Sequence, residues 1–145
     1  MEIYTIGFTK RDARDFFETL RRAGIGLVLD VRLRPSSQLS GFTKARDMPY
    51  FAQMLLSAEY APEPLLAPTS TILDAYRAKR MSWSEYEEEY LTLLETRQVQ
   101  DKVVLGDQDR PLALLCSEFD STKCHRRLAA EYLARSRSDL TIRHL

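Results

Sequence analysis

The chain has 145 residues, which is the usual size of one domain. Its composition, with 44% hydrophobic and 29% charged residues, excludes wholesale disorder. Its 21 basic residues balance 21 acidic ones, which excludes polyanion binding driven by overall charge but allows a local basic patch. The apolar runs are too short to cross a bilayer, and the amino end lacks the pattern of a secretion signal. Two cysteines do not make a disulfide framework, so we expect free thiols and a cytoplasmic protein without membrane contact.

The first thirty residues predict a strand, a helix and a second strand. Residues 3–7 are β-branched and aromatic and end in a glycine, which is typical of a strand. A capping-box-like start at residues 9–12 precedes apolar residues at helical spacing, and Gly24 supplies the stop. Residues 27–31 are apolar without alternation, as in a strand covered on both faces. The succession is a βαβ unit.

The middle of the chain is less regular. Residues 32–47 are rich in serine and contain proline and glycine, which predicts a long loop of the kind that often carries function. A helix is expected to begin near Asp47, and three prolines make residues 60–68 irregular. A short helix is expected around residues 72–76 and a longer one from Ser82.

The last third again alternates strand and helix. Residues 103–105 fit a short strand or a loop equally well. Residues 111–116 predict a buried strand, residues 124–135 a helix and residues 140–144 a final strand. The whole chain, 1–145, is therefore expected to form a single three-layer α/β domain around a mostly parallel sheet.

Polar and reactive side chains follow three of the predicted strands. Ligands of parallel sheets bind beyond the carboxyl ends of the strands, so these groups are expected at one edge. They define a candidate site made of Gly7, Thr9, Asp30, Arg32, Cys116, Glu118, Cys124, His125 and Arg126.

Cys124 is the first candidate for a reactive group. The start of a helix and the neighbouring His125 and Arg126 favour a thiolate there, and they equally favour a bound anion. Cys116 ends an apolar strand, where a cysteine is often core filling, although a chemical role stays open. Glu118 and Asp30 are candidates for proton transfer, or they pair with arginines to fix loops.

Two other uses of the cysteines compete. Cys116, Cys124 and His125 match the donor types of a catalytic zinc site. Their spacing is not that of a known zinc knuckle, and an adjacent cysteine and histidine are expected to point apart, so no metal or cofactor is predicted. A redox disulfide between the cysteines lacks the C-x-x-C spacing.

The long loop suggests a function of a different class. Residues 32–46 include Arg34, Lys44 and two further arginines, and aromatic residues lie nearby. Basic loops with aromatic residues suit nucleotides or single strands, whereas the alternative is a solvated loop.

Several motifs together resemble one protein family. Residues 3–7, Asp30-Val31-Arg32 with Pro35, Leu115-Cys116-Ser117-Glu118, Cys124-His125-Arg126 and the closing Ile142-Arg143-His144 resemble the family called domain of unknown function 488. The resemblance implies a compact α/β domain with the motif residues at one end of the sheet, and it implies no activity. Family members usually have histidine and serine at positions 8 and 9, where this chain has Phe8 and Thr9, and a Leu-Gly-Gly stretch where this chain has Leu65-Leu66-Ala67-Pro68.

The leading hypothesis is an enzyme that acts on a phosphate-bearing small molecule, a nucleotide or a nucleic-acid end. Cys124 would be the nucleophile or anion anchor, and Arg126 and Arg32 would hold the phosphate. Glu118 or Asp30 would move the proton. The alternative is a non-enzymatic module that binds nucleotide or nucleic acid with the loop 32–46.

Overall fold

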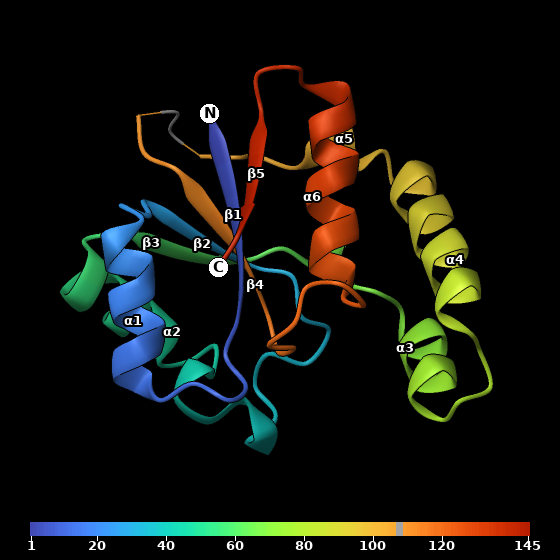
Figure 1. The fold of residues 1–145 in the computed structure, drawn as a ribbon, viewed down its shortest axis with the longest axis horizontal. Helices are drawn as coiled ribbons and strands as arrows, with labels where there is room; N and C mark the ends of the chain where they lie inside the picture. The colour runs from blue at the N-terminus through green and yellow to red at the C-terminus, as the bar shows by residue number, and fades with distance from the viewer. Residues whose placement is uncertain (107–108) are drawn as a thin grey trace.

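The computed structural model describes residues 1–106 and 109–145. Five parallel strands form one sheet in the order β3-β2-β4-β1-β5 (Figure 1). They are β1 (Glu2–Gly7), β2 (Leu27–Asp30), β3 (Glu59–Pro62), β4 (Leu112–Cys116) and β5 (Thr141–His144). The predicted α/β class and its parallel sheet are confirmed.

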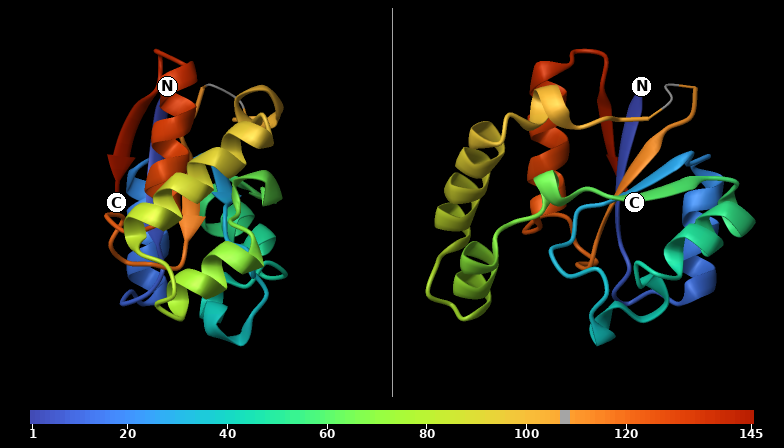
Figure 2. Two further views of the ribbon diagram at one scale, coloured as in Figure 1. Left: turned by 90° about the vertical axis from the view of Figure 1, so that its right-hand side faces the viewer. Right: turned by 180° about the vertical axis from the view of Figure 1, so that it is seen from behind.

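Helices cover both faces of the sheet and give three layers (Figures 1 and 2). One face carries α1 (Ala13–Arg22) and α2 (Met48–Phe51), which continues into a π-helical turn, Ala52–Leu56. The other face carries α4 (Trp83–Thr96), α5 (Val99–Lys102) and α6 (His125–Ser136), and α3 (Ser70–Arg77) packs beside α4. Among the described residues, no helix is both long and apolar enough to cross a membrane.

The central strand β4 divides the core into two halves. All five of its residues are buried, and its side chains alternate between the faces. Leu112, Leu114 and Cys116 join the cluster under α4 and α6, whereas Ala113 and Leu115 join the cluster under α1. This alternation turns Cys116 toward α6.

The helices begin where the sequence supplies caps. The Asp12 carboxylate accepts from the Asp15 backbone N–H at 2.7 Å at the start of α1. Ser82 and Glu85 form a reciprocal capping box at the start of α4. The α6 helix begins at His125, one residue later than predicted, so Cys124 is its N-cap and lies outside the helical turn.

The structure adds detail in the segments that the sequence predicts least well. The stretch 60–68 was expected to be irregular, but it begins inside β3, an edge strand. An edge strand tolerates Pro62 because the lost N–H bond faces away from the sheet. Residues 103–105 are an extended loop after α5, with Leu105 buried. The loop 32–47 contains a 3-10 segment, Gln38–Thr43.

The register of the sheet aligns the carboxyl ends of the central strands. Gly7 of β1 lies opposite Cys116 of β4, and Asp30 of β2 lies opposite Leu115. The segments that follow these three strands therefore emerge side by side. The C-terminal residue, Leu145, donates its N–H to the Thr5 carbonyl at 2.8 Å and continues the pairing of β5 with β1.

Candidate functional site

A cavity of about 370 Å³ opens at the carboxyl end of β4. It lies between the start of α6, the loop after β2 and the pair α3–α4. Four cationic and four aromatic side chains line it, with both cysteines and one carboxylate; these are Arg32, Arg34, Arg77, Lys123, Phe8, Tyr76, Trp83, Tyr86, Cys116, Cys124 and Glu118.

Cys116, Cys124 and His125 meet in the wall of this cavity. Their Sγ and ring-nitrogen atoms all lie within 4.8 Å of one another, and each residue is buried. The two cysteines are free thiols. Cys116 reaches the cluster because it faces α6. Cys124 is the N-cap of that helix, and His125 is its first residue. We call these three residues the Cys–His cluster.

The ring of His125 is fixed by a backbone carbonyl. Its Nε2 lies 2.7 Å from the Val31 carbonyl oxygen, and a carbonyl only accepts, so Nε2 carries a proton. The Tyr90 ring packs edge-on against the imidazole with centroids 5.6 Å apart. Cys116 Sγ lies 3.7 Å from Nδ1, the other ring nitrogen.

The environment of the cluster shifts the pKa values of the two thiols in opposite directions. A hydrogen bond from the Cys124 thiol, with the positive charges of His125 and Arg126, holds the pKa of Cys116 well below its ordinary value despite burial. The same contact, together with burial, raises the pKa of Cys124. Burial alone would lower the pKa of His125, but attraction to Cys116 outweighs it and raises that pKa. This environment favours a Cys116 thiolate beside a His125 imidazolium, with Cys124 as hydrogen-bond donor.

Two thiols and an imidazole are donors that zinc accepts. The expectation that neighbouring Cys124 and His125 point apart is wrong, since their donor atoms converge. Cys116 Sγ lies 3.7 Å from Nδ1, a spacing that allows either a direct ion pair or a metal held between the two atoms. The described residues supply three such donors, one fewer than a closed structural zinc site uses.

Arg126 braces the loop that joins β4 to α6. Its side chain is fully buried and donates to Thr5 Oγ1 at 3.2 Å and to the carbonyls of Glu118 and Phe119. All three guanidinium nitrogens are used inside the protein. Arg126 therefore stands behind the cavity, and it does not line it.

Asp30 and Arg32 form a buried ion pair that fixes the loop after β2. Arg32 donates to the Asp30 carboxylate at 2.6 and 2.9 Å and also to both oxygens of Thr43. The Tyr60 hydroxyl donates to the same carboxylate at 2.5 Å. Burial and this bond raise the pKa of Tyr60. Arg32 reaches the cavity wall, whereas Asp30 does not.

Three further residues of the predicted site lie around the mouth of the cavity. Glu118 and Thr9 line it, and both are exposed. The Thr9 hydroxyl donates to the Ser117 carbonyl at 2.8 Å, which ties the loop after β1 to the loop after β4. Gly7 is packed beneath the Glu118 carbonyl. The structure thus gathers the nine predicted residues at one edge of the sheet and gives most of them partners within the protein.

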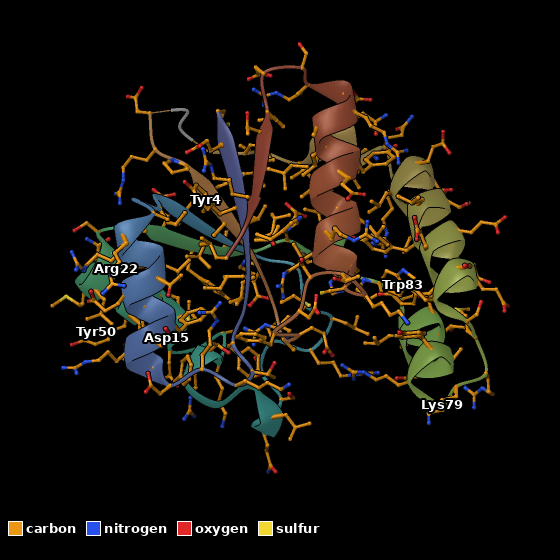
Figure 3. All side chains as sticks on the ribbon, in the orientation of Figure 1. Tyr4, Asp15, Arg22, Tyr50, Lys79 and Trp83 are labelled. Carbon is orange, nitrogen blue, oxygen red and sulfur yellow. The ribbon has the colours of Figure 1, made fainter. Side chains whose placement is uncertain are left out.

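Several cavity residues were not predicted as part of the site. Arg77 and Tyr76 come from α3, and Lys123 directly precedes the Cys-His-Arg motif. Adjacency to that motif is a usable signal for Lys123, whereas α3 has no local signal that places it near β4. Trp83, the first residue of α4 (Figure 3), is half-buried, lines the cavity and also packs against the core. Its ring packs against that of Tyr76.

The fold and the site together define a parallel α/β protein with a Cys–His cluster at the carboxyl edge of its sheet. A family model described as "Domain of unknown function DUF488" matches residues 12–133, and the chain belongs to this family. The match spans the segment from α1 to α6, including the whole Cys–His cluster. No curated protein and no solved structure matches the chain.

Proposed function

We propose that this protein is an enzyme that acts on a phosphate-bearing small molecule, with Cys116 as the nucleophile. The observation that carries the proposal is the 3.7 Å approach of Cys116 Sγ to His125 Nδ1 in the wall of a cationic cavity. A thiolate is the reactive form of cysteine, and a neighbouring imidazolium is a common means of stabilising it. In this proposal Cys124, the nucleophile expected from the sequence, becomes the donor that supports Cys116.

The lining of the cavity supports an anionic substrate. Among the residues that the structure describes, Arg34, Arg77 and Lys123 have no buried partner, and Arg34 makes a long contact of 3.4 Å with Asp74. Such cations suit phosphate oxygens, as point charges or as forked donors. They replace Arg126 and Arg32 as the proposed phosphate ligands, because those two arginines are occupied within the protein.

The aromatic side of the cavity supports a nucleotide-like substrate. Tyr76 and Trp83 line the cavity, with ring centroids 5.6 Å apart. A planar base can pack against such rings in a sequence-tolerant way. Cations and planar rings in the lining of one cavity suit a nucleotide or the end of a nucleic-acid strand.

The proposed reaction proceeds through covalent catalysis. The Cys116 thiolate attacks the phosphorus atom; a sulfur–phosphorus bond forms and the bond from phosphorus to the ester oxygen breaks. The His125 imidazolium gives its Nδ1 proton to the leaving oxygen. Water then attacks the phosphoryl group with neutral His125 as base, which releases phosphate and restores the ion pair. Glu118, at the cavity mouth, is the second group placed to move a proton.

Turnover of phosphorylated compounds tests the proposal. Reduced, chelator-treated protein is screened against nucleotides and oligonucleotide ends, with released phosphate as readout. Cys116→Ser should lose turnover while its thermal unfolding stays close to that of the unsubstituted protein. Lys123→Gln should raise KM with little change in kcat, and Arg135→Gln, on the last turn of α6, is the matched control. Full turnover by Cys116→Ser would show that Cys116 is not the nucleophile.

The alternative, a binding module without activity, makes a different prediction. Such a module binds nucleotide without turnover, and its affinity falls steeply with salt. Arg34 of the basic loop lines the cavity, whereas Lys44 does not, which favours the cavity over the loop as the anion site. Loss of binding in both Arg34→Gln and Lys44→Gln, with Cys116→Ser unchanged, would favour the module. Free thiols fit the cytoplasm, which is the location we propose.

A further inference from the structure

We propose that Cys116 and Cys124 join in a reversible disulfide when the protein meets a hydroperoxide. Cys116 is the residue that the peroxide attacks, and Cys124 is the resolving thiol. The pair lacks the C-x-x-C spacing of sequence-local redox motifs, but the fold supplies the proximity that the spacing does not.

The positions of the two sulfur atoms support this pairing. They lie within 4.8 Å of each other and share the wall of one cavity. A disulfide requires a sulfur–sulfur distance of about 2.05 Å, so a small movement is needed. Cys124 can supply it, because its backbone is extended (φ −135°, ψ 138°) and precedes the first turn of α6.

The surroundings of Cys124 leave the helix intact during that movement. Its side chain makes no full capping bond to α6; the backbone N–H of Arg126 faces the sulfur and acts to lower the pKa of Cys124, so rotation of the thiol gives up this one weak contact. Cys116, in contrast, ends a strand that pairs on both sides and stays in place. The mobile partner therefore approaches the fixed one.

The chemistry needs one oxidant and one proton. The Cys116 thiolate attacks the outer oxygen of the hydroperoxide; a sulfur–oxygen bond forms, the oxygen–oxygen bond breaks, and the departing alkoxide takes a proton from His125. Cys116 is then a sulfenic acid. Cys124 loses its proton to His125 and attacks that sulfur, and the hydroxyl leaves with the same proton as water. The two cysteines are oxidised by two electrons, and the peroxide is reduced.

Access to the sulfur atoms selects for small oxidants. Cys116 is 4% and Cys124 3% exposed, and both line the cavity, which is a route to them. Hydrogen peroxide fits such an opening. The resolving thiol then protects Cys116, because a sulfenic acid without a neighbouring thiol continues to the irreversible sulfinic acid.

One consequence of the disulfide, a loss of turnover, rests on the proposed function. Formation of the disulfide does not. If Cys116 is the nucleophile, the oxidised protein has no thiolate to offer, and its turnover stops until a dithiol reduces it. Disulfide formation is measured by mass alone, without any substrate. Failure of one proposal therefore leaves the other to be judged separately.

Peptide mass spectrometry of three proteins tests the inference. The full chain, Cys116→Ser and Cys124→Ser are treated with a small excess of hydrogen peroxide in chelating buffer, with denaturing alkylation afterwards. The full chain should lose two hydrogen masses in a Cys116–Cys124 cross-linked peptide and regain them with dithiothreitol. Cys124→Ser should instead gain one or two oxygen atoms on Cys116, and Cys116→Ser should keep a free Cys124.

Other results would overturn the inference. Oxygen addition at Cys116 in the full chain, without a cross-link, would show that Cys124 does not resolve it. Equal oxidation of Cys124 in the Cys116→Ser protein would show that the peroxide does not select Cys116. Two thiols that stay reduced until the protein unfolds would exclude the disulfide altogether.

Discussion

The α-carbon of Gly7 packs directly against the Glu118 carbonyl. A Cβ at position 7 would lie 1.5 Å from that oxygen and 2.5 Å from an Arg126 guanidinium nitrogen. The glycine therefore permits a close approach of two loops, from the ends of β1 and β4. The loop that carries Glu118 leads on to the Cys–His cluster, so this contact also sets the position of the cavity wall.

Gly7→Ala should destabilise the protein and disturb the site. The added methyl group meets backbone, which cannot move aside as a flexible side chain does. We expect a loss of about 1–3 kcal/mol in the free energy of unfolding, as for other overpacked positions. The measurement is denaturant unfolding together with the alkylation rate of Cys116. Gly24→Ala is the control: Gly24 has a φ of +70°, and beyond its chain neighbours no heavy atom of the described residues lies within 4 Å of the added Cβ, so stability should fall while Cys116 reactivity stays unchanged.

Alkylation of the two cysteines should begin at different pH values. Cys116 should react with an apparent pKa below the free-cysteine value of about 8.5, and Cys124 above it. The groups that face Cys116 and set this order are Cys124, His125, Arg126, Arg32 and Tyr86. His125→Gln removes a cation that favours the thiolate, so the pKa of Cys116 should rise and its reaction should begin at higher pH.

Two further variants test whether the pKa of Cys116 depends on its immediate neighbours. Cys124→Ala removes the principal hydrogen-bond donor to Cys116 and should also raise its pKa. His144→Gln replaces the second histidine, on the edge strand β5; it is linked to the cluster indirectly, through Thr5 and Arg126, so the profile should change far less than in His125→Gln. Identical profiles for His125→Gln and the full chain would contradict the ion pair.

Arg126 and Arg127 are adjacent but should differ sharply in their contribution to stability. Arg126→Met leaves the partly buried carbonyls of Glu118 and Phe119 without their donor and removes one of the two partners of the Thr5 hydroxyl, so we expect a loss of about 1–3 kcal/mol in total. Arg127 is partly exposed; it pairs with Glu131 one turn along α6 and donates to the exposed Thr122 carbonyl, so Arg127→Met should cost about 1 kcal/mol or less. Thermal and urea unfolding compare them. Equal losses would show that Arg126 does not brace the loop.

Asp30 should contribute to stability and not to proton transfer. Asp30→Asn leaves the buried Arg32 guanidinium without its counter-charge, and breaking such a pair typically costs about 3–5 kcal/mol. The exposed pair Arg34–Asp74 is the control, and Asp74→Asn should cost less than about 1 kcal/mol. Turnover per folded molecule should survive in Asp30→Asn; a selective loss of kcat with stability intact would restore Asp30 as a catalytic candidate.

Much of the fold is predictable from local patterns, because its strands and caps are encoded within a few residues. The unbroken apolar run of β4 and the Ser82–Glu85 capping box each indicate their element directly. The edge strand β3 does not, since Pro62 ends it, Pro64 follows directly, and its pairing with β2 comes from tertiary structure. Four-residue α5 is also too short to produce a helical period.

The candidate site is predictable as a place but less so as a set of roles. Strand ends of a parallel sheet converge, so residues as distant as Asp30 and Cys116 were expected at one edge. Their partners depend on side-chain direction, which the sequence does not contain. Arg126 points inward to the Glu118 carbonyl, and the alternation of β4 brings Cys116 to the cluster. Neither direction is visible in the sequence, where the helix start favours Cys124 over Cys116 as the reactive thiol.

The strand order also constrains how the chain reaches its native state. Among the described residues, β1 pairs with β4 and β5, more than one hundred residues later in the sequence. It must therefore wait for these strands to be synthesised, and the long loops to be closed favour slow folding. Cys116 acquires its neighbours only in that last stage. We therefore expect two ordinary thiols in a nascent or partly folded chain. The difference in pKa between Cys116 and Cys124 should appear only when the sheet is complete.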